Sequence, residues 1–467
     1  MCGIAGVFNS PYASEYVFFM IYSLQHRGQE SVGISSSDGS DIYTVKKTGR
    51  VLEAIKQEDL EKLKGNIAIA HVRYSTAGNA GGVNAQPIVK ETPLGKVAVV
   101  HNGNLVNFLS LRKELENKGI NFEYNSDTEL FLALLEEGKT FVPKNLEIHP
   151  RDKEVLPYIL YVLSRVKGAY SLLFLFKDRL IAVRDPYGFR PLVIGRKDKA
   201  ILFASESCAF DILEADFWRE VAPGEVLILD EEGIRSYRIL NNSERKAKCI
   251  FEFVYFARPD SYIFEEWVYN VRKEMGKQLA REDNVEADVV IPVPDSGIVP
   301  ALGYAEEKNI PFEYGLIRNH YVGRSFIEPT PELRNLRVLM KLSPNRSVLK
   351  GKRIVVIDDS LVRGTTSKRI VSMLRRAGVK EIHMRIASPP VVGPCYYGID
   401  TPTKEELIAN RMPIEDIAKF IGVDSLKYLS LEGLQRCVKS VNEFCDACFS
   451  LNYPVEIVDC IKRKVTR

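Results

Sequence analysis

The sequence predicts two domains of different class: an α+β domain with antiparallel sheets over residues 2–240, and an α/β domain with a parallel sheet and a helical tail over residues 241–467. At roughly 150 residues per domain, the length of 467 residues allows about three domains or two large ones. Short apolar or alternating runs dominate the first half, as in antiparallel sheets covered by helices. From about residue 265, strand and helix patterns alternate, which is typical of a parallel sheet with crossover helices.

The first half contains more predicted strands than predicted helices. The strands are short runs bounded by Gly, Asp, Asn or Pro: 67–73, 97–101, 171–176, 180–184, 192–195, 201–204 and 225–230. Apolar periodicity predicts helices over 16–26, 109–118, 128–137 and 155–166. The stretch NNSERKAK at 241–248 is the expected linker to the second half.

The second half begins with a predicted helix over 267–281, and strand and helix patterns then alternate to about residue 387. Strands are expected over 287–294, 312–317, 353–358 and 381–387, and helices over 299–308 and 366–377. Residues 400–467 are expected to be mostly helical and charged.

Composition excludes several classes of protein. Lys+Arg is 64 and Asp+Glu is 61, a net charge of +3, so there is no reason to propose nucleic acid or an anionic membrane as partner. No window approaches the 18 apolar residues of a membrane span. The apolar run at 16–24 lacks a preceding basic residue and a cleavage site, so we expect a buried helix and a cytoplasmic protein with reduced thiols.

The chain begins Met-Cys-Gly, and removal of Met1 would leave Cys2 with its thiol and the α-amine on one residue. An α-amine has a pKa of about 7.7–8.0 and a thiol about 8.5, so the amine can act as base for its own thiol. Cys2 is therefore a candidate N-terminal nucleophile. The alternative is a small residue that follows Met incidentally.

Four further residues are expected close to the ends of predicted strands or the start of a predicted helix: Arg73, Asn102, Gly103 and Asp127. Arg73 and Asp127 could bind the α-carboxylate and α-amine of an amino acid. The side chain of Asn102 and the N–H of Gly103 could stabilise an oxyanion. Each has a simpler explanation, since Asn-Gly is a common turn and Asp127 could be only a helix cap. His26, His71, His101 and His320 lack metal-ligand spacing and are expected to pack or to position substrate.

The segments CGIAGVF, LQHRGQES, HVRYSTAG, HNGNLVN, SDTE, DPYGFRPL and ASES, in this order, resemble the glutamine amidotransferase domain of the N-terminal-nucleophile hydrolase class. The resemblance covers about residues 2–240 and implies an αββα sandwich. It also implies that Cys2 attacks the side-chain amide of glutamine and releases ammonia. Arg73 and Asp127 would hold the amino-acid head, and Asn102 and Gly103 would form the oxyanion hole.

Residues 352–367, KRIVVIDDSLVRGTTS, place an acidic pair between a buried strand and a helix. Backbone N–H groups at a helix start bind phosphate, and adjacent carboxylates bind ribose hydroxyls or Mg²⁺. The alternative is a plain acidic turn. Neither a Walker A motif nor a G-x-G-x-x-G turn is present.

This segment resembles the phosphoribosyl pyrophosphate loop of type I phosphoribosyltransferases, and the similarity extends over residues 285–390. It implies substrate binding by Asp358, Asp359, Ser360, Arg363, Gly364, Thr365 and Thr366. The VPDSG segment at 293–297 adds Ser296, which with Asp358 and Asp359 is expected to bind Mg²⁺ and pyrophosphate.

Both halves in this order resemble the amidophosphoribosyltransferase family, which makes 5-phosphoribosylamine, pyrophosphate and glutamate in the first committed step of purine biosynthesis. The resemblance also implies feedback by purine nucleotides and a homodimer or homotetramer. Two alternatives are another glutamine amidotransferase and a non-catalytic purine sensor. The missing SGG-x-DS motif weighs against the first, and Cys2 with its predicted neighbours weighs against the second.

The cysteines allow two metal sites. Cys445-x-x-Cys448 could join Cys437 and Cys460 in a local zinc site. The family resemblance instead implies Cys249 and Cys395 as partners, in a 4Fe–4S cluster of structural role. The segment 318–334, with Arg318 and Arg324, is expected to close over the bound substrate.

Overall fold

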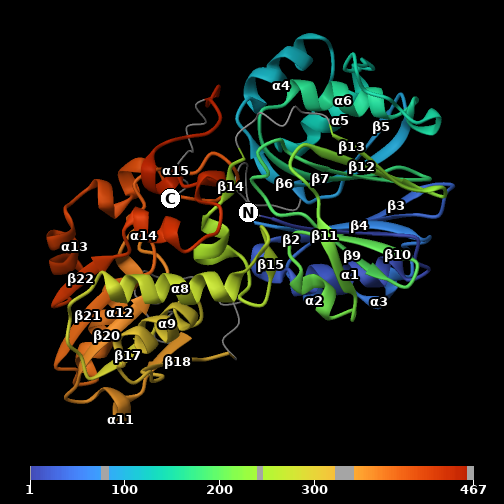
Figure 1. Cartoon of the computed structure of the whole chain (residues 1–467). Coiled ribbons are helices and arrows are strands. Elements are labelled where there is room, and N and C mark those ends of the chain that lie inside the picture. Colours follow the sequence, from blue (N-terminus) through green and yellow to red (C-terminus); the bar gives the residue numbers. More distant parts are fainter. Residues whose placement is uncertain (1, 75–83, 239–245, 321–340, 460–467) are drawn as a thin grey trace.

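The structure is a computed structural model that describes residues 2–74, 84–238, 246–320 and 341–459. Two lobes meet along one side, with the blue-to-green first lobe next to the yellow-to-red second lobe (Figure 1). The boundary predicted between residues 240 and 241 falls outside the described residues and stays a prediction. Within the described ranges, no helix is both long and apolar enough to span a membrane.

The first lobe contains two antiparallel sheets stacked on each other. The seven-stranded sheet has the order β11 (Asp216–Glu220), β9 (Val193–Lys197), β10 (Ala200–Ala204), β1 (Gly3–Phe8), β4 (Ile67–Arg73), β2 (Ser31–Ser37) and β3 (Ile42–Thr48). The six-stranded sheet has the order β13 (Gly233–Arg238), β12 (Glu225–Asp230), β8 (Leu180–Arg184), β7 (Gly168–Leu175), β6 (Gly95–Leu105) and β5 (Ile88–Thr92). Apolar side chains such as Ile4, Ile69 and Leu173 fill the space between the sheets.

Helices cover the outer face of each sheet (Figure 1). The seven-stranded sheet is covered by α1 (Ala13–Ser23), the 3₁₀ turn η1 (Gln25–Arg27), α2 (Val51–Ala54), α3 (Gln57–Leu60) and α7 (Cys208–Asp211). The other sheet is covered by α4 (Phe108–Asn117), α5 (Thr128–Glu136) and α6 (Leu156–Arg165), with η3 (Pro150–Asp152) leading into α6. The predicted αββα sandwich is confirmed.

Four strands of the first sheet were not predicted: β1, β2, β3 and β11. The sequence of β2, SVGISSS, is rich in serine, yet every residue of the strand is buried. A hydrogen bond of 2.8 Å between the hydroxyls of Ser35 and Thr44 pairs two of these polar groups across β2 and β3. The partners of such a strand lie on neighbouring strands, so the alternation of apolar residues does not reveal it.

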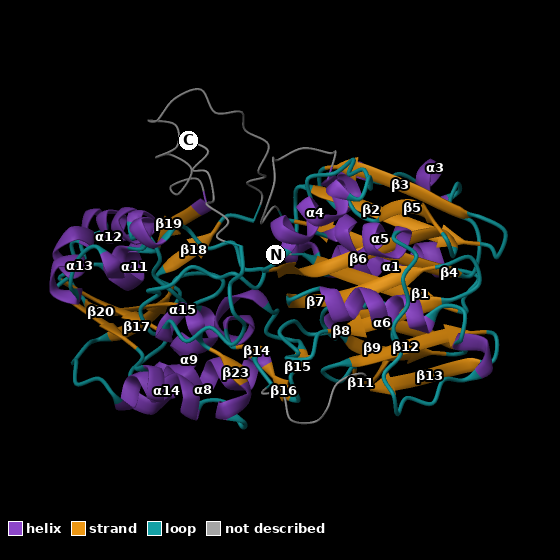
Figure 2. Cartoon of the chain, turned by 90° about the horizontal axis from the view of Figure 1, so that it is seen from above, coloured by secondary structure: helices purple, strands orange, loops and turns teal. Residues whose placement is uncertain are grey.

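The second lobe is built on a four-stranded parallel sheet of order β17 (Val289–Pro292), β20 (Arg353–Asp358), β21 (Glu381–Ile386) and β22 (Ser425–Tyr428). Alternate residues of β17 face opposite sides: Val290 packs towards α8 (Val268–Arg281) and α9 (Ile298–Lys308), and Ile291 towards α12 (Thr365–Arg376) and α13 (Ile414–Ile421). The predicted parallel sheet is confirmed, and Figure 2 shows it between its helices.

Two predictions for this lobe were wrong in detail. Residues 312–317 do not form one strand: Phe312 makes an isolated parallel bridge to Val290, and β18 (Leu316–Arg318) pairs antiparallel with β19 (Leu342–Pro344). Residues 400–467 are not mostly helical in their described part, since they supply β22 and a second strand, β23 (Phe444–Cys445). Both strands are short and depend on partners distant in sequence, β21 and β14 (Lys248–Cys249).

The remaining elements are short. They are the π-helical turn η4 (Glu252–Phe256), the hairpin β15 (Tyr262–Ile263) and β16 (Glu266–Trp267), the helices α11 (Arg346–Leu349), α14 (Leu431–Arg436) and α15 (Ala447–Ser450), and the 3₁₀ turns η5 (Lys404–Glu406), η6 (Ile408–Asn410) and η7 (Val441–Glu443).

Candidate active sites

Cys2 directly precedes β1, the central strand of the seven-stranded sheet, and its side chain is buried. The guanidinium Nε of Arg27, in η1, donates to the main-chain carbonyl of Cys2 at 3.0 Å. Gly28 lets this turn approach β4 closely, because a Cβ there would lie 2.6 Å from the main chain of Arg73. The close approach brings Cys2, Arg27 and Arg73 together at one end of the sheet.

Asn102 and Gly103 were expected at the end of a strand, but β6 continues to Leu105, so they lie within it, opposite Ser171 and Tyr170 of β7. Asn102 is fully buried, and neither polar atom of its side chain has a hydrogen-bond partner among the described residues. A Cβ on Gly103 would lie 2.0 Å from the carbonyl oxygen of Ala169, so only glycine fits. A buried amide without a partner costs free energy unless a ligand satisfies it, and this supports a polar ligand at Asn102.

Asp127 directly precedes α5 and lies beside His101 of β6. Its Oδ2 accepts from the N–H of Leu105 at 3.1 Å, and its Oδ1 lies 3.6 Å from Nδ1 of His101. Burial opposes ionisation of Asp127, but the charges of His101 and Arg73 hold its pKa below the usual range. The pKa of His101 is raised, since Asp127 outweighs the effect of burial, and the Cys2 thiolate acts in the same direction. These electrostatic interactions place Cys2, Arg73, His101 and Asp127 in one region.

Asp127 and Arg73 were expected as substrate ligands, and His101 as a packing or positioning residue. The ion pair of His101 with Asp127 was not predicted, although HNGN contains this histidine. The role of Arg27 was also missed. Its only sequence signal was the position of Arg27 next to Gly28 in LQHRGQES.

The second group of predicted site residues lies where β17 and β20 end. Pro292 and Ile357 are register partners, so the segment after β17 and the segment after β20 leave the sheet side by side. A Cβ on Gly297 would lie 2.4 Å from the carbonyl oxygen of Ile357, which explains a glycine at this crossing. The Ser296 hydroxyl bonds the Asp359 carboxylate and lowers its pKa.

Asp358 and Asp359 are both buried, with 8% and 5% of their surfaces exposed. Burial raises the pKa of both carboxyls, and the adjacent charge of Asp359 raises that of Asp358 further. Arg272 and the hydroxyls of Ser296 and Ser360 oppose this effect at Asp359. Two neighbouring carboxylates that are costly to ionise fit a divalent cation, whose charge would lower both pKa values.

The loop between Asp359 and α12 has the features of a phosphate site. Gly364 adopts φ +73° as the residue before the helix, a conformation that favours glycine. Thr365 and Thr366 begin α12, and the guanidinium of Arg363 forms an ion pair of 2.9 Å with Glu406. A cavity of about 650 Å³ opens next to this loop, between the lobes, and its lining includes His26, Arg258, Ser296, Arg318 and Thr366. Most of the segment 318–334, including Arg324, lies outside the described residues.

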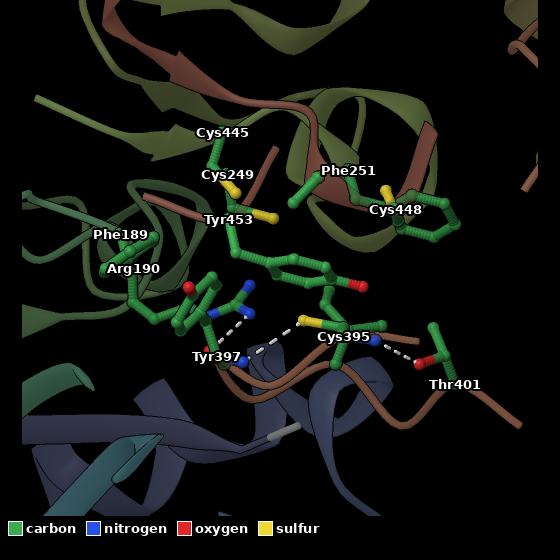
Figure 3. A pocket seen from close by; sticks show the side chains of 12 residues that line it. Phe189, Arg190, Cys249, Phe251, Cys395, Tyr397, Thr401, Cys445, Cys448 and Tyr453 are labelled. Carbon is green, nitrogen blue, oxygen red and sulfur yellow. Dashed lines mark hydrogen bonds between the residues drawn. The ribbon is translucent and has the colours of Figure 1, made fainter. Parts of the chain in front are cut away.

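The four cysteines implied by the family resemblance line one cavity. Cys249 of β14 is the register partner of Cys445 in β23, and Cys395 and Cys448 line the same cavity (Figure 3). Cys437 instead donates its thiol to the carbonyl of Gly433 at 3.1 Å within α14, and Cys460 lies outside the described residues.

The cavity is lined by four thiols, a ligand type that zinc and iron–sulfur clusters both take. Among the described residues, no group of three or more His, Cys, Asp or Glu side chains is close enough to hold one metal ion. A cubane cluster binds each thiolate through a different iron, so its ligands stand farther apart than those of zinc. Burial raises the pKa of Cys249 to about 11 and those of Cys445 and Cys448 well above the usual range. Without a cation, ionisation of these neighbouring thiols is therefore unfavourable.

The two lobes and their sites define a glutamine amidotransferase fused to a phosphoribosyltransferase. Residues 71–211 match the family described as glutamine amidotransferase domain, and residues 268–387 match the family described as phosphoribosyl transferase domain. Among curated proteins, amidophosphoribosyltransferase 1 of Arabidopsis thaliana is 49% identical, with 97% of this chain and 79% of that protein covered. The amidophosphoribosyltransferase of Methanocaldococcus jannaschii is 47% identical, with 98% of each chain covered.

Solved structures agree with these relatives. The glutamine phosphoribosylpyrophosphate amidotransferase of B. subtilis, complexed with ADP and GMP, is 45% identical, with a TM-score of 0.89 and 98% of each chain covered. This chain belongs to the amidophosphoribosyltransferase family, enzymes of the glutamine-dependent amination of phosphoribosyl pyrophosphate in purine biosynthesis. The assignment decides against the alternatives of a non-catalytic sensor and a different amidotransferase.

Proposed function

We propose that Cys2 is the nucleophile that releases ammonia from glutamine. Its thiolate attacks the side-chain amide carbon, the C–N bond breaks, ammonia leaves, and water then hydrolyses the glutamyl thioester to glutamate. Arg73 and Asp127 bind the α-carboxylate and α-amine of glutamine. Asn102 and the N–H of Gly103 stabilise the oxyanion. The observation that supports this most is the fully buried Asn102 amide, which lacks a partner among the described residues.

We propose that the ammonia displaces pyrophosphate from C1 of phosphoribosyl pyrophosphate at the second site. The N–H groups at the start of α12, with Ser360, Arg363, Gly364, Thr365 and Thr366, bind the 5-phosphate, and Asp358 and Asp359 bind the ribose hydroxyls. Ser296, Asp358 and Asp359 hold Mg²⁺ with its waters, which supplies positive charge to the leaving pyrophosphate. Transfer of the ammonia without exposure to bulk water would keep it unprotonated and nucleophilic.

We propose that Cys249, Cys395, Cys445 and Cys448 bind a 4Fe–4S cluster. Such a cluster would supply a covalent crosslink between the β14 strand, the 395–401 loop and the C-terminal segment. Cys437 is no ligand in this proposal, because its thiol is bonded within α14.

We also propose a cytoplasmic homodimer or homotetramer, of two domains with the boundary at 240/241, that is inhibited by purine nucleotides. The ADP and GMP bound to the B. subtilis enzyme support nucleotide regulation. The curated plant relatives are named chloroplastic, whereas the Methanocaldococcus jannaschii relative is not.

Separate assays of the two half-reactions test this proposal. Cys2→Ser is expected to abolish phosphoribosylamine synthesis from glutamine and to leave synthesis from ammonia intact, because the oxygen of serine is a far weaker nucleophile at neutral pH. Asp359→Asn serves as the matched control, since it is expected to lower both activities. Equal loss of both activities in Cys2→Ser would overturn the assignment of Cys2.

A further inference from the structure

Four buried charged side chains form a network where the two lobes meet. Arg27, Arg190, Glu206 and Glu252 each have 1% or less of their surface exposed. Arg27 and Arg190 come from the first lobe, and Glu252 comes from η4 in the second. Two positive and two negative charges balance, as buried ionic groups require. The proposed reaction uses none of Glu252, Glu206 and Arg190.

Glu252 and Arg27 form a two-pronged ion pair. Oε2 of Glu252 accepts from Nη1 of Arg27 at 3.0 Å, and Oε1 accepts from Nη2 at 2.8 Å. This geometry fixes the plane of the guanidinium, whose remaining nitrogen, Nε, donates to the Cys2 carbonyl at 3.0 Å. The main chain of Cys2 is therefore held by a group whose orientation Glu252 sets.

The same carboxylate faces the cysteine cavity on its other side. Oε1 of Glu252 also accepts from Nη1 of Arg190 at 3.2 Å. Arg190 donates through Nε and Nη2 to the carbonyl of Tyr397, at 3.0 and 2.7 Å, and the N–H of Tyr397 donates to Sγ of Cys395 at 3.4 Å. Figure 3 shows Arg190 directed at Tyr397 and the hydrogen bond that joins Tyr397 to Cys395. Glu252 thus lies between the Cys2 main chain and the wall of the cavity.

Glu206 shares Nη1 of Arg27 with Glu252 and differs from Glu252 in its remaining contacts. It bonds Nη1 of Arg27, Nε2 of His26 at 2.7 Å and the hydroxyl of Ser261 at 2.7 Å. Glu206 therefore connects Arg27 to Ser261 of the second lobe, whereas the connection of Arg27 to the cysteine cavity depends on Glu252.

We propose that Glu252 is a positioning residue for the Cys2 nucleophile, which it orients through Arg27 and couples to the cysteine cavity through Arg190. The inference rests on the proposed role of Cys2. Replacement of Glu252 by an uncharged residue removes the carboxylate that contacts both Arg27 and Arg190. The four-residue network then has two positive charges and one negative charge. The guanidinium of Arg27 then loses one of its two contacts with residue 252. Its Nε, which donates to the Cys2 carbonyl, is no longer held in one orientation.

The test uses the full chain with Glu252→Gln and Glu252→Asp, compared with the wild type. A misplacement of about 1 Å in a reacting group costs on the order of a hundredfold in rate, so kcat/KM for glutamine is expected to fall by about that factor in Glu252→Gln. Alkylation of Cys2 by a diazoketone analogue of glutamine is expected to slow in parallel. Synthesis from ammonia is expected to stay at the wild-type rate, and Glu252→Asp, which keeps the charge, is expected to recover part of the loss.

Asp283→Asn is the matched control, because Asp283 is another buried carboxylate with a two-pronged contact, to Arg385, but lies away from Cys2. It is expected to lower thermal stability without changing the alkylation rate. If Glu252→Gln loses both activities equally, or alkylates at the wild-type rate, the positioning role is overturned. If Glu252→Gln fails to fold, Glu252→Asp takes its place in the test. Alkylation of Cys2 at the wild-type rate in Glu252→Asp then overturns the proposal. Cys2→Ser, measured alongside, separates failure of this inference from failure of the nucleophile assignment.

Discussion

Cys249 and Cys445 lie directly opposite each other in the parallel pairing of β14 with β23. Each strand has only two residues, and so short a pairing contributes little free energy by itself. The N–H of Cys249 donates to the carbonyl of Phe189 in the DPYGFRPL loop, and the N–H of Ile250 donates to the carbonyl of Cys445, which extends the contact. The C-terminal segment is thus attached to the junction of the two lobes at Cys249 and Cys445.

Anaerobically purified protein is expected to be brown, with about four irons per chain, as four-cysteine ligation of a 4Fe–4S cluster requires. Cys445→Ser is expected to remove the colour and most of the iron, which elemental analysis and absorbance spectra would measure. Cys437→Ser is the control and should keep both. Colourless wild-type protein that contains one zinc would contradict the prediction.

Asp127→Asn is expected to lower kcat/KM for glutamine by about 10- to 100-fold, since a hydrogen bond to a charged group contributes about 1.5–3 kcal/mol. Synthesis from ammonia should not change. Steady-state assays with each nitrogen donor would measure the difference. A loss confined to kcat, with KM for glutamine unaltered, would speak against a role in binding the amino-acid head.

The ion pair of Asp127 with His101 also predicts a pH dependence of stability. The pKa of His101 is raised above 6.5, so its contribution is complete below pH 6.5 and is lost as the pH rises through the raised value. The pKa of Asp127 is lowered below 3.8, so its contribution is complete above pH 3.8 and is lost in stronger acid. The difference in unfolding free energy between wild type and Asp127→Asn should therefore be largest between pH 3.8 and 6.5. Urea unfolding at several pH values would measure it, and a difference that grows above pH 6.5 would contradict it.

Asp358→Asn is expected to stabilise the ligand-free protein at neutral pH while it abolishes synthesis from either nitrogen donor. The pKa of Asp358 is raised above 3.8, mainly by burial, so the ionised form costs stability as the pH rises through that value. The neutral amide avoids this cost, with an expected gain of about 1 kcal/mol, similar to other single stabilising changes. Thermal unfolding would measure the gain.

Addition of Mg²⁺ with phosphoribosyl pyrophosphate should raise the unfolding temperature of the wild type and have little effect on Asp358→Asn. Asp424→Asn is a control. Asp424 directly precedes β22, at the end of the parallel sheet opposite to Asp358, and pairs with Arg375. An Asp358→Asn protein that is less stable than the wild type at neutral pH would show that burial of this carboxylate is not costly.

The sequence determined both fold classes and most of the central strands, because apolar alternation and buried apolar runs are local properties. The run RIVVID, for example, is a buried strand in any context that covers both of its faces, and it is β20 in the structure. The motifs also placed Cys2, Asp127 and the 358–366 loop at strand or helix ends, where main-chain geometry favours ligand binding, whereas Asn102 was expected at a strand end and lies within β6.

Only the tertiary structure decided features that depend on partners far apart in the chain. The buried serines of β2, the four-residue strand β22 and the pairing of Cys249 with Cys445 have no local signal, since each is stabilised by a segment distant in sequence. The same holds for Glu252, which nothing in FEFVYFARPDS marks as different from a surface glutamate. Its burial between Arg27 and Arg190 arises because the two lobes meet there, and the free energy of a buried charge depends on those partners.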